Sequence, residues 1–487
     1  MTTLATTLPG PAATTAALAG ALAVILALAL LMGRRREAFP LLAILALPFR
    51  VPIAADGRTV NLLIPLYLVV AAGTLSRLAP RLLGRGGGEA RREGEDPGEG
   101  REGGSGDGRG GTSLRRGSAW LSPRGLEWLL LASVVVYAVQ GTYSGDHTKA
   151  LENIAFFYLP FGLLFIGLRD VPWTRDLLVA CLGLAVALAV AFAGVGFVEY
   201  YRKALFLNPK VVAANQYDNY FRVNSVFFDP SIYGRFLALV MVALTTVVLW
   251  SRRRRDVLVG AAALAWLLAG LVTSFSESSI AALLLGLVVL AAYRWDVRGT
   301  LYVGVALVAI AVVVLAAAPT SLHFGLKGSG GSTNNATSGR ANLISGGLEL
   351  FAERPLEGYG SGSFETEYRR HNSRTSAENA TSASHTIPVT VAAEQGIVGL
   401  AVYLALLIVA MLVLFSGAGR SPPRVAIAAC FGALVLHTWT YADFLEDPMT
   451  WTLLGIGVAC ARGGRSLWET RSVVASPSPV GAGHQPL

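Results

Sequence analysis

Residues 384–404 have the sequence SHTIPVTVAAEQGIVGLAVYL, in which a polar segment changes into a long apolar run. A polar stretch, 319–385, precedes this run, and most of the remaining chain is apolar. His385 therefore stands at the entrance of a helix that is expected to continue into a membrane span. Gly396 is the expected position of a break in that helix, because glycine tolerates backbone conformations that interrupt one.

The polar stretch contains its own structural pattern before His385. The apolar residues of 340–351 have mostly helical spacing, and Ser338 can cap the start of this helix. Pro355 should stop the helix, and Gly358-Tyr359-Gly360-Ser361-Gly362 should form a turn that residues with side chains follow only with difficulty. The helix 340–353 is expected to lie across the outer ends of the spans and to bury an apolar stripe made of Leu343, Ile344, Leu348 and Phe351.

Composition places the chain in a membrane. Hydrophobic residues make up 53% of its 487 residues and charged residues 15%, too apolar a balance for a soluble protein of this size. The net charge of +9 is concentrated in runs such as Arg34–Arg36 and Arg252–Arg255 at span ends, where the positive-inside rule places them, so it does not indicate nucleic-acid binding. All three cysteines lie in apolar runs, which gives no disulfide framework or cysteine-based metal site.

Apolar run length predicts about 13 spans, each long enough to approach or cross a bilayer. They are 14–32, 38–54, 60–79, 126–144, 150–168, 176–198, 231–250, 256–273, 277–294, 300–318, 397–416, 424–442 and 448–462. The arginine-rich connections alternate with the others, so one orientation places 199–230 and 319–385 outside. An even number of spans would result if the short segment 38–54 or 448–462 were re-entrant or broken.

The chain divides by composition into six parts. The Gly-, Glu- and Arg-rich segment 81–124 has almost no apolar residues and is expected to be a disordered cytoplasmic linker. The predicted parts are N-terminal spans 1–80, the linker 81–124, central spans 125–318 with the outer loop 199–230, a large extracytoplasmic loop 319–385, C-terminal spans 386–465 and a disordered cytoplasmic tail 466–487.

These motifs resemble the O-antigen ligase and polymerase family of membrane glycosyltransferases. The order R…F…RPLEGYGSGSF…SH…EQGIVGLAVYL over 340–404 follows the family's order, and Phe221–Gly234, FRVNSVFFDPSIYG, resembles its Arg-containing Pro-x-x-x-Gly segment. The resemblance implies an all-α polytopic membrane protein of the GT-C-like kind, with about 12–13 transmembrane helices and a large helical extracytoplasmic loop. Ser276-Glu277-Ser278 departs from the family, whose members often carry a Ser-Arg pair there.

The resemblance implies catalytic roles for Arg222, Arg340 and His385. Without it, an arginine near a membrane is more often an interfacial anchor or half of a surface ion pair, and a loop histidine is more often structural. Two guanidinium groups would stabilise the negative charge that grows on a departing pyrophosphate. A neutral imidazole at a helix N-terminus would take the proton from an acceptor hydroxyl. All three residues are expected to converge on one pocket at the outer face.

Five further residues are candidates for contacting substrate: Arg235, Tyr359, Gly360, Arg369 and Arg370. Arg235 could equally be a snorkelling arginine, and the other four more readily shape or solvate the loop. Asp443, Glu446 and Asp447 cluster after a span, but the sequence has no Asp-x-Asp pair or histidine cluster of the kind that divalent-cation transferases use. No metal and no cofactor is therefore expected.

The predicted function is transfer or polymerisation of an undecaprenyl-pyrophosphate-linked glycan onto an acceptor hydroxyl at the outer face of the cytoplasmic membrane. The expected partners are this donor, a glycan, lipid or protein acceptor, and membrane lipids. The alternative is a transporter or flippase of lipid-linked glycans. Carriers tend to place ionisable groups at the bilayer midplane, whereas here they gather at span ends and in outer connections, which favours the enzyme. Ligase, polymerase and protein O-oligosaccharyltransferase share these motifs.

Overall fold

The structure is a computed structural model that describes residues 11–55, 58–82, 121–206, 221–295, 298–306, 340–371 and 386–463. The predicted linker and tail, and most of the predicted span 300–318, lie outside these residues. The secondary structure is almost entirely helical. The helices are α1 (Pro11–Arg34), α2 (Ala38–Ala46), α3 (Ile64–Leu82), α5 (Pro123–Gly141), α6 (His147–Asn153), the π-helix η1 (Ile154–Tyr158), α7 (Leu159–Arg169), α8 (Arg175–Arg202), α10 (Pro230–Trp250), α11 (Arg254–Thr273), α12 (Glu277–Arg294), α15 (Arg340–Glu353), α16 (Phe364–His371), α17 (Ile387–Phe415), the 3₁₀-helix η4 (Ala418–Arg420), α18 (Pro422–Thr440) and α19 (Pro448–Arg462).

Seven of the described helices are long and apolar enough to cross a membrane. They start at Thr15, His147, Arg175, Pro230, Arg254, Glu277 and Ile387. The other predicted spans fall on described helices that are shorter or less apolar, or outside the described residues. Large apolar side chains are exposed on the outer helices, for example Leu18 on α1 and Leu258 on α11, as lipid-facing residues are. The prediction of a polytopic helical membrane protein is confirmed.

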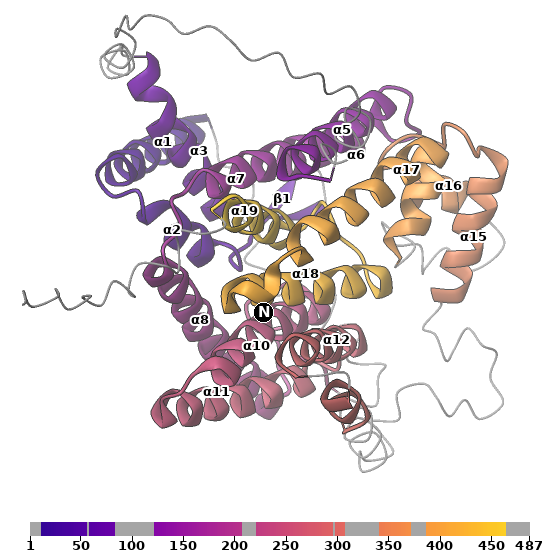
Figure 1. Cartoon of the computed structure of the whole chain (residues 1–487). Coiled ribbons are helices and arrows are strands. Elements are labelled where there is room, and N and C mark those ends of the chain that lie inside the picture. Colours follow the sequence, from indigo (N-terminus) through magenta and orange to yellow (C-terminus); the bar gives the residue numbers. More distant parts are fainter. Residues whose placement is uncertain are drawn as a thin grey trace, which may run out of the picture.

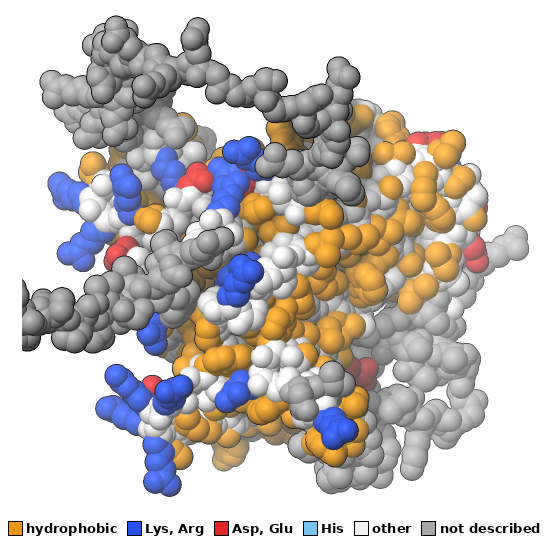
Figure 2. All heavy atoms as spheres, in the orientation of Figure 1, with side chains coloured by type: hydrophobic (Ala, Val, Ile, Leu, Met, Phe, Trp, Pro, Cys, Tyr) orange, Lys and Arg blue, Asp and Glu red, His pale blue; other side chains and the backbone are white. Residues whose placement is uncertain are grey.

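Charged side chains are concentrated at one end of this bundle. Figure 2 shows most Lys and Arg side chains at the left of the view and an apolar surface across its middle, while α15 and α16 lie at the right in Figure 1. The arginines of this end include Arg34–Arg36 before α2 and Arg252–Arg255 around the start of α11. We call it the arginine-rich end, and the opposite end, with α15 and α16, the loop end.

The C-terminal helices join two groups of helices. In Figure 1, α17, α18 and α19 lie between α5 and α7 on one side and α10 and α12 on the other. The packing agrees, because α18 contacts both α10 and α12, α19 contacts α7, and α17 contacts α5. Among the seven helices that could cross a membrane, α10 is the most deeply enclosed: 72% of the residues in its most apolar stretch are buried, against 11% for α1. The fold thus brings the loop before α10 and the loop after α18 into the protein interior.

Two of these inner helices begin with the same Asp-Pro signal. The Asp229 carboxylate accepts hydrogen bonds from the backbone N–H groups of Ser231 and Ile232 at the start of α10, and Pro230 occupies the first turn. At the start of α19 the Asp447 carboxylate accepts from the N–H of Met449, with Pro448 next to it. Capping satisfies N–H groups that a helix start would otherwise leave unpaired. Both aspartates are thereby fixed at the loop end.

Residues 38–54 do not form a continuous span. Helix α2 has nine residues and is followed by an antiparallel hairpin of β1 (Val51–Ala55) and β2 (Arg58–Leu62), in which Val51 pairs with Leu62. At 1.5 Å per residue such a helix is about 14 Å long and crosses only half of an apolar core. The hairpin was not predicted. Its strands pair with each other and so satisfy their own backbone groups, while Leu47 and Phe49 donate to the carbonyl oxygens of Ala43 and Ala46 at the end of α2.

Helix α15 packs against α17 and α16, although its buried face differs from the predicted one. Leu343 and Leu350 are buried, while Leu348 is 50% exposed, so including Leu348 in the stripe was wrong. The buried face runs through Gly346 and Gly347 instead. A Cβ on Gly347 would lie 2.6 Å from Val389 Cγ1, which shows how closely α15 approaches α17. Small residues at this contact set the helix orientation more strongly than the wider apolar pattern does.

The glycine turn after α15 is interlocked with a break in α17. Gly396 has φ +61° inside α17, as predicted, and its N-terminal neighbours accept backbone hydrogen bonds from the turn. The N–H of Tyr359 donates to the Ala393 carbonyl oxygen (3.1 Å) and the N–H of Gly360 to the Glu394 carbonyl oxygen (2.7 Å). In return, the N–H of Ile397 donates to the Pro355 carbonyl oxygen (2.8 Å). We call this set of backbone contacts the clamp.

Replacing Gly396 by Ala should destabilise the protein. The residue has a left-handed conformation, and its Cβ would overlap the Leu356 carbonyl group. Strain of this kind costs about 1–3 kcal/mol, and the overlap adds to it. Thermal unfolding in detergent should show a clearly lower midpoint for Gly396→Ala. The matched control is Gly183→Ala in α8, where a Cβ meets no atom within 4 Å and alanine favours the helix. Equal unfolding midpoints for the two variants would contradict the expected contribution of the clamp to stability.

Candidate functional site

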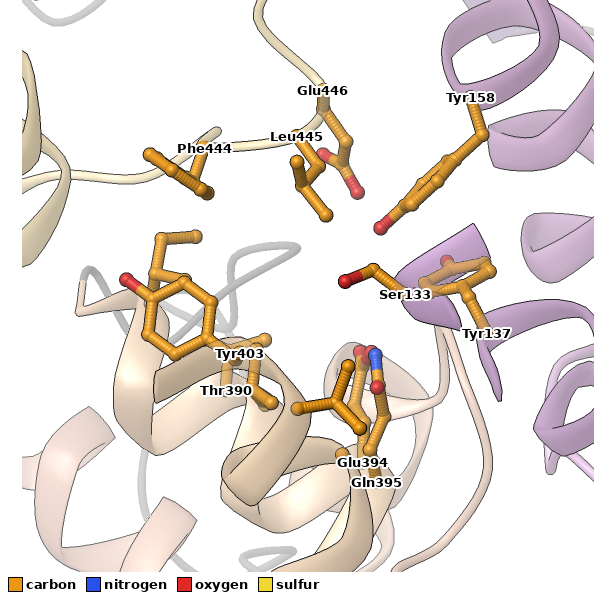
Figure 3. Close-up of a pocket in the computed structure, with 14 residues that line it drawn as sticks. Ser133, Tyr137, Tyr158, Thr390, Glu394, Gln395, Tyr403, Phe444, Leu445 and Glu446 are labelled. Atoms are coloured by element: carbon orange, nitrogen blue, oxygen red, sulfur yellow. The ribbon is translucent and has the colours of Figure 1, made fainter. Parts of the chain in front are cut away.

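A polar pocket opens between α5, η1, the start of α17 and the loop that joins α18 to α19 (Figure 3). Tyr137, Tyr158, Tyr403 and Phe444 contribute aromatic walls. The remaining lining residues are Ser133, Ile387, Thr390, Val391, Glu394, Gln395, Gly399, Val402, Leu445 and Glu446. Tyr158 belongs to η1, and π-helical turns of this kind are frequent at functional sites. The lining contains two carboxylates and no Lys or Arg.

Glu446 points into the pocket from the loop between α18 and α19 (Figure 3). Its Oε1 accepts a hydrogen bond of 2.9 Å from the Asn153 side-chain amide, which also donates to the Tyr137 hydroxyl oxygen (2.7 Å). Burial raises the pKa of Glu446 above the usual range of a glutamate, the charge of Asp443 raises it further, and Lys149 lowers it. The side chain is therefore oriented by Asn153 and holds a proton more readily than an exposed glutamate.

Glu394 lines the opposite side of the pocket and supports the glycine turn. Its two carboxylate oxygens accept hydrogen bonds from the backbone N–H groups of Gly362 (2.8 Å) and Phe364 (3.0 Å). The same residue's carbonyl oxygen accepts from Gly360 in the clamp. A carboxylate at the start of α16 also interacts favourably with the helix dipole. Glu394 thus connects the pocket to the loop between α15 and α16.

Arg235 is buried behind the pocket in an ion pair with Asp447. The side chain is 1% exposed, and its guanidinium donates to the Asp447 carboxylate and to the carbonyl oxygens of Asp443 (3.2 Å) and Ala442 (3.3 Å). Asp447 accepts from Arg235 with one oxygen and caps α19 with the other. These protein acceptors account for the NH1 and NH2 donors of Arg235.

Two more arginines are held by contacts with other loops, and one of them, Arg50, lies within the field of Asp443 and Asp447. The Arg50 guanidinium stacks on the Phe228 ring, 4.5 Å from its centroid, and burial lowers the pKa of Arg50, while the charges of Asp443 and Asp447 raise it. The Arg222 Nε donates to the Ser274 carbonyl oxygen (3.2 Å) at the end of α11. Nearby loop residues adopt left-handed conformations: Ser225 (φ 53°), Phe275 (φ 49°) and Asp443 (φ 67°). Such strain is concentrated at functional sites in proteins.

The loop 441–447 separates these two environments. Glu446 faces the pocket, whereas the next residue, Asp447, faces Arg235. Among the residues that the structure describes, no three His, Cys, Asp or Glu side chains are placed to hold a metal ion.

The structure describes the side chain of only one of the three predicted catalytic residues. His385 lies outside the described residues, and for Arg340 only the backbone, at the first position of α15, is described. The neighbours of His385 are placed: the Thr386 hydroxyl donates to the Trp439 carbonyl oxygen, and Ile387 lines the pocket. Of the three residues expected to converge, Arg222 is the one whose side chain is described, and convergence stays a prediction.

The other predicted contact residues have protein partners within the loop. The Tyr359 hydroxyl is bonded to Glu353, and the Arg354 guanidinium lies over its ring. Gly360 has φ +93°, and a Cβ there would overlap Ser144. On α16, Arg369 pairs with Glu365 and Arg370 with Glu367, each at 2.6 Å. None of the predicted residues that the structure describes lines the pocket.

Sequence reasoning missed the pocket. Tyr137 and Tyr158 lie in predicted spans, where an aromatic residue carries no functional signal of its own. Glu446 was noted only as part of an acidic cluster, and Glu394 only as part of the E-x-G motif before the span. A polar residue such as Asn153 inside an apolar run was the available signal, because such residues are costly in a membrane and need a partner.

Asp447→Asn should destabilise the protein by about 3–5 kcal/mol, because it leaves the buried Arg235 charge without its partner. Asparagine can still cap α19, so the change removes the charge and keeps the cap. The double variant Arg235→Met with Asp447→Asn should recover part of the loss. The measurement is unfolding of the three proteins in detergent. A single variant within about 0.5 kcal/mol of the parent, the range of neutral surface changes, would contradict the structural role of the pair.

Comparison with known proteins supports the resemblance found in the sequence. Residues 262–404 match the family model described as O-antigen ligase. The matched segment includes α12, α15, the glycine turn, α16 and the first half of α17, and it excludes Arg222, Arg235 and Glu446. No curated protein matches the chain. Through this domain the match supports membership of the O-antigen ligase family, whose activity is glycan transfer of the ligase or polymerase type.

Proposed function

We propose that the chain transfers or polymerises an undecaprenyl-pyrophosphate-linked glycan onto an acceptor hydroxyl at the outer face of the cytoplasmic membrane. The observation that carries the proposal is the O-antigen ligase match over 262–404, which contains Arg340, the glycine turn and His385. The structure supports it with a polar pocket at the loop end, next to a group of arginines.

The proposed orientation follows from the distribution of arginine. The arginine-rich end would be cytoplasmic, because positively charged connections remain on that side of the membrane. The loop end would then be extracytoplasmic, where lipid-linked glycans are joined to their acceptors. Impermeant maleimide can test this with few interfering reactions, since Cys181, Cys430 and Cys460 are all buried.

In the proposed reaction an acceptor oxygen attacks the anomeric carbon, the bond from that carbon to the phosphate oxygen breaks, and the lipid pyrophosphate departs. Arg222 and Arg340 would hold the pyrophosphate, because a guanidinium offers two parallel hydrogen bonds to phosphate oxygens. His385 would accept the proton of the acceptor hydroxyl. Its neighbour Thr386 is bonded to the end of α18, and Ile387 lines the pocket. The reaction is proposed to need no metal, because the arginines would supply the positive charge and the sequence has no Asp-x-Asp pair or histidine cluster.

The topology prediction uses two cysteine variants, Ser345→Cys on α15 and Arg253→Cys before α11, both at exposed positions. In intact cells, impermeant maleimide should label position 345, whereas position 253 should react only after the membrane is permeabilised. The parent protein, whose native cysteines are buried, serves as the background control. Labelling of position 253 in intact cells without labelling of 345 would reverse the proposed orientation.

The mechanistic prediction concerns Arg340→Lys and His385→Ala. Lysine keeps the charge of Arg340 but loses the planar fork, so transfer should still be impaired. Loss of a base or of one charge-stabilising donor typically lowers the rate about 10²–10⁴-fold. The purified chain should be reconstituted with a lipid-pyrophosphate glycan and candidate acceptors, with release of free lipid pyrophosphate measured.

Donor binding should be measured separately in the same variants. A base acts mainly in the transition state, so His385→Ala should bind the donor almost normally. Arg253→Lys, at an exposed position of the arginine-rich end, is a matched control that should keep activity. Near-normal turnover in His385→Ala would remove this residue as the base. Lost donor binding in a folded variant would place His385 at the donor instead.

A further inference from the structure

The pocket has the wrong charge for a pyrophosphate. Its ionisable lining residues Glu394 and Glu446 are both acidic, and Asp443 lies close enough to raise the pKa of Glu446. Glutamates offer no positive charge to an anionic group, and their ionised fraction repels it. A neutral ligand rich in hydroxyl groups would instead find hydrogen-bond acceptors there. The arginines that suit an anion lie on the other side of the loop 441–447.

Two polar groups in the pocket are placed for a ligand. The Asn153 amide donates a hydrogen bond to Oε1 of Glu446. Within the described part of the chain, no hydrogen bond to Oε2 of Glu446 is found. Tyr158 is 6% exposed, its hydroxyl points toward Glu446 in Figure 3, and among the described residues it has no hydrogen-bond partner. Neither atom is among the fully enclosed polar atoms that lack a partner, so both are accessible from the pocket, and each can form a hydrogen bond to a ligand. A ligand with two hydroxyl groups would satisfy both.

The aromatic lining fits the same ligand. Tyr137 and Tyr158 are stacked with ring centroids 4.4 Å apart on one side of the pocket, and Tyr403 and Phe444 pack edge-on at 5.6 Å on the other (Figure 3). These rings offer apolar walls to the C–H faces of a sugar ring while the carboxylate and hydroxyl take its O–H groups. Binding sites for small polar molecules combine such walls with few, well-placed polar atoms.

We propose that this pocket is the subsite for one sugar ring of the transferred or receiving glycan, with Glu446 and Tyr158 binding its hydroxyl groups. The assignment rests on the proposed function and deepens it. The sugar belongs either to the lipid-linked donor or to the acceptor, and both present the same hydroxyl chemistry. Asn153 acts as a positioning residue, because its amide holds Glu446 in the orientation that leaves Oε2 facing the pocket.

In this proposal the loop 441–447 separates the arginine side, which suits the pyrophosphate, from the pocket, which suits the sugar. Asp447 is bonded to Arg235 on the arginine side, and Glu446 faces the pocket one residue earlier. A glycosyl pyrophosphate has an anionic part and a neutral sugar part joined by one bond. Such a molecule would bind across this loop in one orientation, with its pyrophosphate on the basic side and its sugar on the acidic side.

A labelling experiment tests the subsite without requiring turnover. The full chain in lipid nanodiscs is treated with a hydrophobic carbodiimide, which modifies protonated carboxyl groups, and modification of Glu446 is measured by mass spectrometry. Burial raises the pKa of Glu446, so enough of it is protonated near neutral pH. The probes are a prenyl-pyrophosphate-linked disaccharide, the same prenyl pyrophosphate without sugar, and a panel of soluble disaccharides of glucose, galactose and N-acetylglucosamine.

The expected result is protection of Glu446 by a sugar-bearing probe and none by the bare prenyl pyrophosphate. Protection by the lipid-linked disaccharide alone assigns the ring to the donor, and protection by a soluble disaccharide assigns it to the acceptor. Equal protection by the bare carrier, or no protection by any glycan, would overturn the proposal. The Glu446→Gln variant is the control for the assignment of the label, because it has no carboxyl group at position 446 to modify.

Kinetics of Glu446→Gln provide the second measurement. The amide keeps the size of the side chain and an oxygen for Asn153 but loses the charge, so the KM for the sugar-bearing substrate should rise about 10–100-fold with a smaller change in kcat. Glu365→Gln on α16 is the matched control and should behave like the parent. If Glu446→Gln releases lipid pyrophosphate with a normal KM, and no sugar-bearing probe protects Glu446 in the parent protein, the subsite is rejected. The proposed function is then retained. Protection by glycans without any transfer would reject the proposed function and leave the subsite.

Discussion

The backbone clamp between the glycine turn and the break in α17 is the constraint on which the loop end depends. The N–H groups of Tyr359 and Gly360 donate to carbonyl oxygens just before Gly396, and Ile397 donates back to Pro355. The loop before α6 completes the contact, since the Ser144 hydroxyl donates to the Ser361 carbonyl oxygen (2.8 Å) and the Gln140 amide to that of Gln395 (3.0 Å). Because the contacts of the clamp itself are between backbones, they require left-handed glycines and tolerate few substitutions. The clamp fixes α15 and α16 over the start of α17, where the pocket opens.

The same contact explains why the pocket can hold charged groups inside an apolar bundle. Glu394 is satisfied by backbone N–H groups of the turn, and Glu446 by Asn153. Each carboxylate would be too costly in the interior without these donors. Breaking the clamp would therefore remove the partners of Glu394 and deform the pocket wall together. Stability and site geometry are coupled here through hydrogen bonds rather than through the size of the apolar core.

Much of this architecture could be predicted from the sequence, because it depends on local signals. The apolar runs predicted the helical membrane protein, and the turn residues predicted the glycine turn and the break at Gly396. Three features could not be predicted. The 38–54 run contains a short helix and a strand because tertiary pairing of β1 with β2 overrode its apolar length. Leu348 is exposed because two glycines set the α15 contact. The pocket joins residues 133, 158, 394 and 446, whose proximity is a property of the packing and has no sequence period.

The arginines show that residue type alone is weaker evidence for a functional role than the surroundings of the side chain. Arg235 stood in the family-like segment and looked available, yet its NH1 and NH2 groups donate to Asp447 and to two carbonyl oxygens. Arg50 carried no motif, and it stacks on Phe228 within the field of Asp443 and Asp447. The positive charge on this side of the loop 441–447 is partly neutralised by those acids, which lets several arginines approach each other without strong repulsion. An incoming pyrophosphate would then compete with Asp443 for the exposed part of this charge. Under the proposed function, this competition would weaken the hold on the anion and so favour release of the lipid pyrophosphate after transfer.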